Sequence, residues 1–136
     1  MKKYEAEAFI PRDPRHCANV ILDPTNLPRW FAGAKGVAPS EGYPHVDGIL
    51  TFRMGPFRFD EKVLENGLPA RFIVAVHNAF GDARVTTTFA TQGDGTRYRK
   101  EVEFTPRGVL GLISPLVVPR NVRREVARAA ALATSS

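Results

Sequence analysis

The segment between residues 35 and 105 consists of short apolar or alternating runs that are separated by turn residues at hairpin spacing. This spacing is typical of an antiparallel meander, in which each strand pairs with the next one along the chain. Asn66-Gly67 and Gly93-Asp94-Gly95 are clear turn signals, because these residues adopt the backbone conformations that tight hairpins need. The sequence therefore predicts six consecutive strands, which cover 36–42, 49–54, 57–64, 71–78, 84–91 and 96–105.

Further elements are predicted before this meander. Residues 4–10 alternate between apolar and polar side chains, as a half-buried strand does. Asp13-Pro14 and Asp23-Pro24 each combine an N-cap residue with proline at the first helical position. One strand and two short helices are therefore expected ahead of the six strands.

After Pro106 the apolar pattern becomes helical and stays so to the end of the chain. Pro115 and Pro119 cannot both lie inside one regular helix without loss of backbone hydrogen bonds, so a break is expected there. The regular part should begin near Pro119 or Arg120. The predicted apolar face of the whole helical segment after Pro106 consists of Leu112, Leu116, Val122, Val126, Ala129 and Ala133.

The composition fits one globular domain that spans residues 1–136, with 43% hydrophobic and 24% charged residues. Cys17 is the only cysteine, so the fold must be held by its core and not by an intramolecular disulfide. Polar residues follow Met1-Lys2-Lys3 where a signal peptide would be apolar. The most apolar stretch, 109–118, is about half the length of a membrane span. A cytoplasmic protein is expected.

Four segments spread over nearly the whole chain match the motifs of one known superfamily. D-P-x-x-L-P-x-W fits residues 23–30, G-x-x-x-F-x-M fits 48–54, D-G-T-R fits 94–97, and an apolar tail follows Gly108. In this order they resemble the START-like superfamily, also called SRPBCC or helix-grip, and within it the polyketide cyclase/dehydrase-like branch. The resemblance implies an α+β fold with a curved antiparallel sheet of about seven strands. This sheet would wrap around a long C-terminal helix, with two short helices after the first strand.

The same resemblance implies a pocket between the sheet and the C-terminal helix that holds lipids, sterols, quinones, plant hormones or polyketide intermediates. The leading hypothesis is therefore binding or transport of a small hydrophobic ligand. The alternative is an enzyme of the polyketide cyclase or dehydratase type, in which Glu61, Lys100, Tyr98 or His77 would move protons. Such proteins share no single catalytic motif, so the resemblance transfers no catalytic residue to this chain.

Strand alternation predicts which side chains face the pocket, because successive residues point to opposite faces of a sheet. Taken one by one, these residues are also typical of an ordinary core. As a set they favour a cavity, since a curved sheet has more concave area than one helix can cover. The predicted pocket residues are Trp30, Phe31, Phe52, Met54, Phe57, Phe59, Glu61, Phe72, Val74, Val76, Thr87, Phe89, Tyr98, Lys100, Val102, Leu112 and Leu116.

Glu61 and Lys100 interrupt the apolar phase of their strands. An unpaired buried charge is costly, so each needs a partner, a water molecule or a shifted pKa. One interpretation is that they face each other across the pocket and orient a polar group of the ligand. The other, which the sequence favours, is that a β-bulge or a solvated rim places both outside the pocket.

No metal site or cofactor is expected. His16, His45 and His77 lie far apart in sequence, and none has a second ligand at metal-binding spacing. Cys17 falls on an apolar helix face, as a small buried hydrophobe would. Ser114 lies outside any nucleophile-elbow motif.

The C-terminal arginines are the strongest alternative site. Arg120, Arg124 and Arg128 recur every four residues, in a chain with 19 basic and 14 acidic residues. Such a stripe would contact the phosphates of RNA or of an anionic membrane, although it is also typical of the solvated face of an amphipathic helix. No DNA partner is expected, and the sequence does not specify an oligomeric state.

Overall fold

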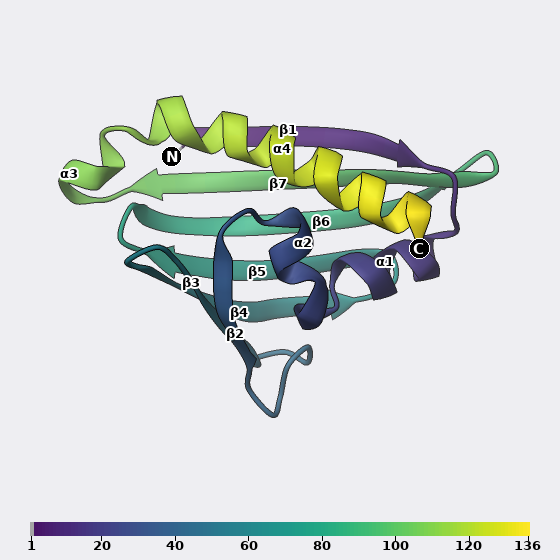
Figure 1. Ribbon diagram of the computed structural model, residues 1–136, viewed down its shortest axis with the longest axis horizontal. Helices are drawn as coiled ribbons and strands as arrows, with labels where there is room; N and C mark the ends of the chain where they lie inside the picture. Colours follow the sequence, from purple (N-terminus) through teal and green to yellow (C-terminus); the bar gives the residue numbers. More distant parts are fainter. Residues whose placement is uncertain (1) are drawn as a thin grey trace.

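The computed structural model describes residues 2–136 and contains a seven-stranded antiparallel sheet. The strand order is β1-β7-β6-β5-β4-β3-β2, so that the N-terminal strand pairs with the last one (Figure 1). The predicted meander is confirmed. The strand expected at 36–42 lies earlier in the sequence, at 34–39, because the chain turns after Ser40, and β4 and β6 extend beyond their expected bounds. The observed strands are β1 Lys2–Ile10, β2 Ala34–Pro39, β3 Ile49–Met54, β4 Phe57–Gly67, β5 Arg71–Asn78, β6 Gly81–Gln92 and β7 Gly95–Pro106.

The short helices after β1 begin where the Asp-Pro pairs predict. The Asp13 side chain accepts a hydrogen bond of 2.9 Å from the His16 backbone N–H and caps α1 (Pro14–Ile21). Asp23 caps the 3-10 helix η1 (Pro24–Asn26) in the same way, and α2 (Leu27–Trp30) follows directly. These helices lie with the C-terminal helix on one face of the sheet (Figure 1). That side is therefore the concave face on which the core forms.

The C-terminal helix starts earlier than predicted. After α3 (Gly108–Gly111), α4 runs without interruption over Ser114–Ser135 and contains Pro119. Pro115 occupies a first-turn position, where its missing N–H costs nothing. Pro119 has no backbone N–H to donate to the Pro115 carbonyl, so one helical hydrogen bond is lost there, but the helix continues. The expected break lies between α3 and α4 instead.

The earlier helix start changes which side chains share a face. Val122, Val126, Ala129 and Ala133 are buried in the core, as predicted. Leu116 is exposed, because six residues separate it from Val122, which places it about 120° around the helix. Leu112 precedes α4 and is also exposed. The expected common face thus does not include these two leucines, and they lie outside the pocket.

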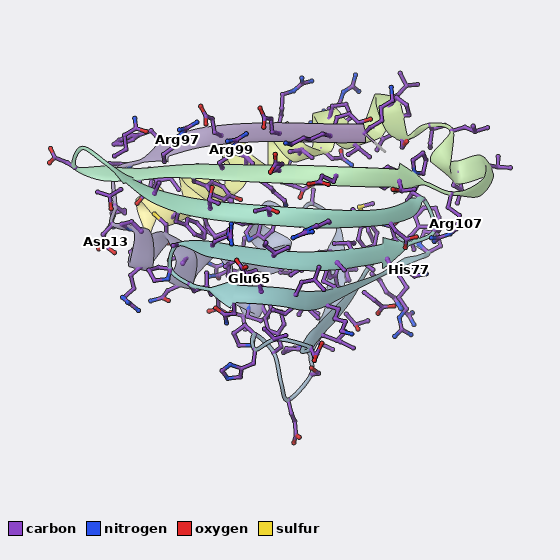
Figure 2. All side chains as sticks on the ribbon, turned by 180° about the vertical axis from the view of Figure 1, so that it is seen from behind. Asp13, Glu65, His77, Arg97, Arg99 and Arg107 are labelled. Atoms are coloured by element: carbon purple, nitrogen blue, oxygen red, sulfur yellow. The ribbon has the colours of Figure 1, made fainter. Side chains whose placement is uncertain are left out.

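The two faces of the sheet differ as strand alternation predicts. The concave face buries Leu50 and Phe52 of β3, together with Phe72, Val74 and Val76 of β5. The opposite face carries mostly charged side chains, among them Arg97, Arg99, Glu65 and His77 (Figure 2). Opposite charges pair across neighbouring strands there, as Arg97 of β7 does with Glu7 of β1 at 2.7 Å.

Candidate functional site

A cavity of about 170 Å³ lies between the concave face of the sheet, the segment from α1 to α2, and α4. It is close in size to cavities of about 150 Å³ that hold a benzene-sized molecule. It is smaller than the roughly 300–1,000 Å³ of pockets for drug-sized ligands. The aromatic side chains of the concave face therefore do not fill the interior completely, and one ring or a short acyl segment fits between them.

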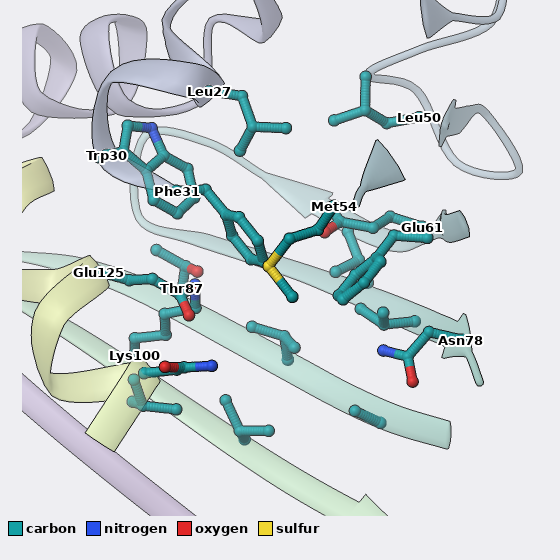
Figure 3. Close-up of a pocket in the computed structure, with 18 of the residues that line it drawn as sticks. Leu27, Trp30, Phe31, Leu50, Met54, Glu61, Asn78, Thr87, Lys100 and Glu125 are labelled. Atoms are coloured by element: carbon teal, nitrogen blue, oxygen red, sulfur yellow. The ribbon is translucent and has the colours of Figure 1, made fainter. Parts of the chain in front are cut away.

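The walls of the cavity are apolar. Phe31 and Met54 lie in the middle of the close-up view of the cavity (Figure 3). The Phe31 ring packs edge-to-face on Phe59 at 5.6 Å and on Phe52 at 5.2 Å between centroids. Edge-to-face packing is favourable for aromatic rings and limits their motion. This wall is thus a packed cluster that a ligand would contact on one side.

An ion pair closes one side of the cavity. The Lys100 Nζ lies 2.7 Å from a Glu125 carboxylate oxygen, and the two side chains are only 10% and 13% exposed. The same Nζ lies 4.8 Å from the centroid of the Trp30 ring, within the range of a cation–π contact. The Trp30 indole N–H donates a 3.0 Å hydrogen bond to the Ile21 carbonyl, which holds the ring in place. Lys100 is therefore fixed by two contacts inside the protein.

The surroundings of Lys100 keep it charged. Burial acts to lower the pKa of Lys100, but the Glu125 carboxylate, Tyr98 and Glu61 act to raise it, and the net pKa is above its ordinary value. A lysine whose pKa is raised remains a cation throughout the physiological range. The cavity thus always contains one positive charge, which Glu125 neutralises.

Glu61 lies on the other side of the cavity, in β4 (Figure 3). Burial raises the pKa of the Glu61 carboxyl to about 7, with Lys100 acting to lower it and Glu125 to raise it. No hydrogen bond from another side chain within residues 2–136 contributes to this pKa. Glu61 is therefore a half-buried carboxyl that faces an apolar cavity and exchanges its proton near neutral pH.

The structure places both Glu61 and Lys100 on the cavity, whereas the sequence favoured a position outside it. Glu61 pairs with Val76 in register, and Lys100 pairs with Thr87, so neither strand has a bulge at these positions. Alternation therefore holds, and both side chains point to the concave face with their apolar neighbours. The buried charge of Lys100 is compensated by the Glu125 carboxylate. The raised pKa of Glu61 means that this carboxyl takes up a proton more readily, so burial of a negative charge is avoided.

The remaining predicted residues divide into cavity lining and surrounding core. Phe52, Phe89 and Tyr98 are buried but do not line the cavity, and Phe89 stacks on Tyr98 at 5.4 Å. Phe57 packs on Phe80 at 4.8 Å, at the margin of the sheet. The predicted residues that do line the cavity are Trp30, Phe31, Met54, Phe59, Glu61, Phe72, Val74, Val76, Thr87, Lys100 and Val102.

Glu125 is the most important site residue that the sequence analysis missed. It follows Val122 by three residues and precedes Ala129 by four, so helical spacing places it on the buried face of α4. It is also the only carboxylate after Glu103. Tyr43, from the loop between β2 and β3, lines the cavity as well, but no periodic pattern marks a loop residue.

The other candidate residues lie away from the cavity. His77 is exposed on the outer face, where its Nδ1 lies 2.6 Å from a carboxylate oxygen of Asp82. The His16 Nε2–H donates a 3.1 Å hydrogen bond to the Ala133 carbonyl and thereby ties α1 to α4. Cys17 is buried. Among residues 2–136 no group of three or more His, Cys, Asp or Glu side chains is arranged to hold a metal ion.

The family model described as "Polyketide cyclase / dehydrase and lipid transport" matches residues 1–134. The chain belongs to this family. Its helix-grip fold confirms the START-like resemblance of the sequence, and the family and fold together identify a hydrophobic ligand-binding architecture. No curated protein matches the chain at a significant level.

Solved structures share this family fold at low sequence identity. Protein CV1439 from Chromobacterium violaceum is 20% identical with a TM-score of 0.79, and the match covers 98% of this chain and 99% of that protein. TTHA0849 from Thermus thermophilus is 17% identical with a TM-score of 0.79, with 98% of both chains covered. DynU16, a protein of the dynemicin biosynthetic locus, is 14% identical with a TM-score of 0.75. That match covers 96% of this family member and 46% of DynU16.

Proposed function

We propose that this protein binds a small hydrophobic molecule that carries one polar group, and that it does so in the cavity between the sheet and α4. The observation that carries the proposal is the apolar cavity of about 170 Å³ with the Glu61 carboxyl on its wall, whose pKa is raised by burial. A ligand that buries roughly 200 Å² of apolar surface gains on the order of 5 kcal/mol before ordering costs. This gain would supply the affinity.

The polar residues would select the orientation of the ligand. Glu61 near neutral pH either accepts a hydrogen bond as a carboxylate or donates one as a carboxylic acid. Lys100 donates hydrogen bonds, and only part of its donor capacity is used by Glu125. A hydroxyl or carbonyl group on an otherwise apolar ring matches these two groups. Quinones and polyketide-like rings contain such a combination, and a short acyl chain with a polar end presents a similar one.

A second candidate function is acid–base catalysis of the cyclase or dehydratase type. It is favoured by the Glu61 carboxyl, because a pKa of about 7 suits a group that both takes up and releases a proton. Of the four residues considered for this role, Glu61 and Lys100 line the cavity, while Tyr98 and His77 do not. A Glu61→Gln variant would keep ligand binding and lose turnover if the protein is an enzyme.

The binding proposal is tested with 2-naphthol, a small aromatic hydroxyl compound, as the probe. Trp30 is the only tryptophan of the chain and lines the cavity, so its fluorescence reports occupancy directly. The Val85→Phe variant should fill part of the cavity and raise the Kd for 2-naphthol by about tenfold or more, a loss of about 1.4 kcal/mol. The measurement is a fluorescence titration at constant pH.

Val37→Phe is the matched control, because Val37 is a half-buried strand residue that does not line the cavity. It should leave the Kd unchanged, and thermal unfolding checks that both variants are folded. The proposal fails if wild-type protein does not bind the probe, or if the two variants change its affinity equally.

A further inference from the structure

The end of the molecule formed by α3 and the first turn of α4 exposes a group of large apolar side chains. Leu112 is 78% exposed and Leu116 is 76% exposed. We call this group the α3–α4 patch; it consists of Val109, Leu110, Leu112, Ile113 and Leu116. Five large aliphatic side chains within eight residues are unusual on a surface in contact with water, and such clusters mark interaction sites.

The residues that follow the α3–α4 patch make its surroundings strongly cationic. Arg120, Arg123 and Arg124 are exposed on α4, and Arg120 lies one helical turn from Leu116. Within residues 107–136 the only acidic side chain is that of Glu125, which is turned inward and paired with Lys100. The exposed side chains of this segment therefore carry positive charge without any compensating acidic side chain among them.

Neighbouring elements do not neutralise this charge. Asp82, near the start of β6, is an acidic side chain at this end of the sheet, and it is already engaged by Arg107 at 2.8 Å and by His77 at 2.6 Å. β1, which packs against α4, begins at this end of the molecule with Lys2 and Lys3 (Figure 1). Lys3 is paired with Glu101 of β7 at 2.5 Å, so it adds little to the charge of the patch, whereas the arginines of α4 do. The charge around the patch is thus predominantly basic.

The α3–α4 patch also adjoins the cavity. Ser114, Val117, Val118 and Asn121 line the cavity from the same helical turns whose outer side carries Leu116 and Arg120. A surface that contacts the patch would therefore lie directly over the segment that closes this side of the cavity.

We propose that the α3–α4 patch docks the protein on the surface of an anionic lipid bilayer. Aliphatic side chains that enter the boundary between headgroups and acyl chains, flanked by arginines that meet anionic headgroups, form an interfacial binding surface. The proposal concerns the outer surface and does not require the cavity ligand to be a lipid.

Two other occupants fit the patch less well. A second copy of the chain, related by a two-fold axis, would bring the same arginines of both copies together. An RNA strand would contact the arginines, but residues 107–136 contain no aromatic side chain for bases to stack on. Neither partner uses both the aliphatic and the cationic part of this surface.

The test is flotation of the protein with lipid vesicles. Wild-type protein should bind vesicles of phosphatidylcholine with about 30% phosphatidylglycerol, and bind phosphatidylcholine alone far more weakly, since anionic headgroups attract nearby arginines. The double variant Leu112→Gln with Leu116→Gln should reduce binding about tenfold or more through lost apolar insertion. The double variant Arg120→Glu with Arg123→Glu should reduce it by a similar factor.

Matched controls carry the same changes elsewhere on the surface. Val46→Gln with Ile49→Gln removes two exposed apolar side chains, and Arg15→Glu with Arg29→Glu makes the same change in net charge. Both controls should bind anionic vesicles as wild type does. All four variants should bind 2-naphthol normally, which separates vesicle docking from cavity binding.

Three results would overturn the proposal. The first is wild-type protein that does not float with anionic vesicles, and the second is control variants that lose binding as much as the patch variants do. Light scattering could instead show a wild-type dimer that the leucine variant converts to a monomer, which would assign the patch to a second copy of the chain.

Discussion

Two neighbouring residues of β7, Arg99 and Lys100, show how differently an ion pair behaves on the two faces of one sheet. Arg99 points to the outer face and pairs with Glu5 of β1, with side chains that are 39% and 52% exposed. Lys100 points to the concave face and pairs with Glu125 of α4 inside the protein. Both pairs join a basic side chain to a glutamate, and they differ strongly in their access to water.

This difference indicates what each pair is for. Exposed pairs gain little, because water and salt screen them and two long side chains must be ordered. A buried pair loses hydration that its attraction does not reliably regain, so apolar residues of similar volume are often at least as stabilising. The Lys100–Glu125 pair is therefore poorly explained by stability alone. Its position on the cavity supports the proposed role of Lys100 in orienting the polar group of a ligand.

The largest predicted effect follows from breaking the buried pair on one side only. Lys100→Met leaves the Glu125 carboxylate without its partner in a nearly buried position and should lower the free energy of unfolding by about 3–5 kcal/mol. Replacing both residues, with Lys100→Met and Glu125→Leu, removes the unpaired charge and should recover most of this loss. Urea denaturation at pH 7 measures both variants. A double variant no more stable than the single one would show that the pair itself stabilises the fold.

A smaller effect on stability is predicted at Glu61, whose burial favours the protonated, neutral form of the carboxyl. The pKa of Glu61 is raised from 4.5 to about 7, so between these pH values the folded protein holds a proton that the unfolded chain releases. The free energy of unfolding should therefore fall as pH rises from about 4.5 to 7, by about 1–3 kcal/mol, and change no further from this group above pH 7.

Glu61→Gln isolates this contribution, because glutamine has nearly the same shape and does not titrate. The variant and the wild type should be similarly stable at pH 5, and the variant should be more stable at pH 8 by about 1–3 kcal/mol. Other titrating groups contribute equally to both proteins and cancel in the difference. Parallel stability curves for the two proteins from pH 5 to pH 8 would mean that Glu61 is not kept from ionising by the cavity.

The sequence predicted the sheet and its concave face well, because alternation in each strand is a local property. The same rule, applied strictly, places Glu61 and Lys100 on the cavity. The interpretation that put them outside gave more weight to the cost of burying a charge than to strand register. At Lys100 that cost is offset by Glu125, which belongs to a different element 25 residues away in sequence. At Glu61 it is offset by the raised pKa of the carboxyl. A partner supplied by tertiary packing is not visible in the pattern of one strand.

The C-terminal segment was less predictable than the sheet. Its helical character and the buried residues from Val122 onward follow from periodicity. The helix start does not, because a proline is favourable in the first turn and costs a hydrogen bond in the interior, and the sequence alone does not fix which applies to Pro115 and Pro119. If the helix start is placed wrongly, the residues near that start are assigned to the wrong face of the helix. Leu112 and Leu116 therefore moved from the expected pocket to the exposed surface.

The smallest predicted effect is at the exposed pair, and it completes the comparison within β7. Arg99→Met, like Lys100→Met, replaces a basic side chain of β7 by an apolar one. The partner that it leaves behind, Glu5, is exposed to water and keeps its hydration. The urea midpoint should stay within measurement error of wild type at moderate salt, and any difference should vanish as salt is raised. If Arg99→Met destabilised the protein as strongly as Lys100→Met, the position of a charge relative to the cavity would not determine its energetic importance. The recognition role assigned to Lys100 would then lose its main support, because the effect would belong to β7 as a whole and not to the face that borders the cavity.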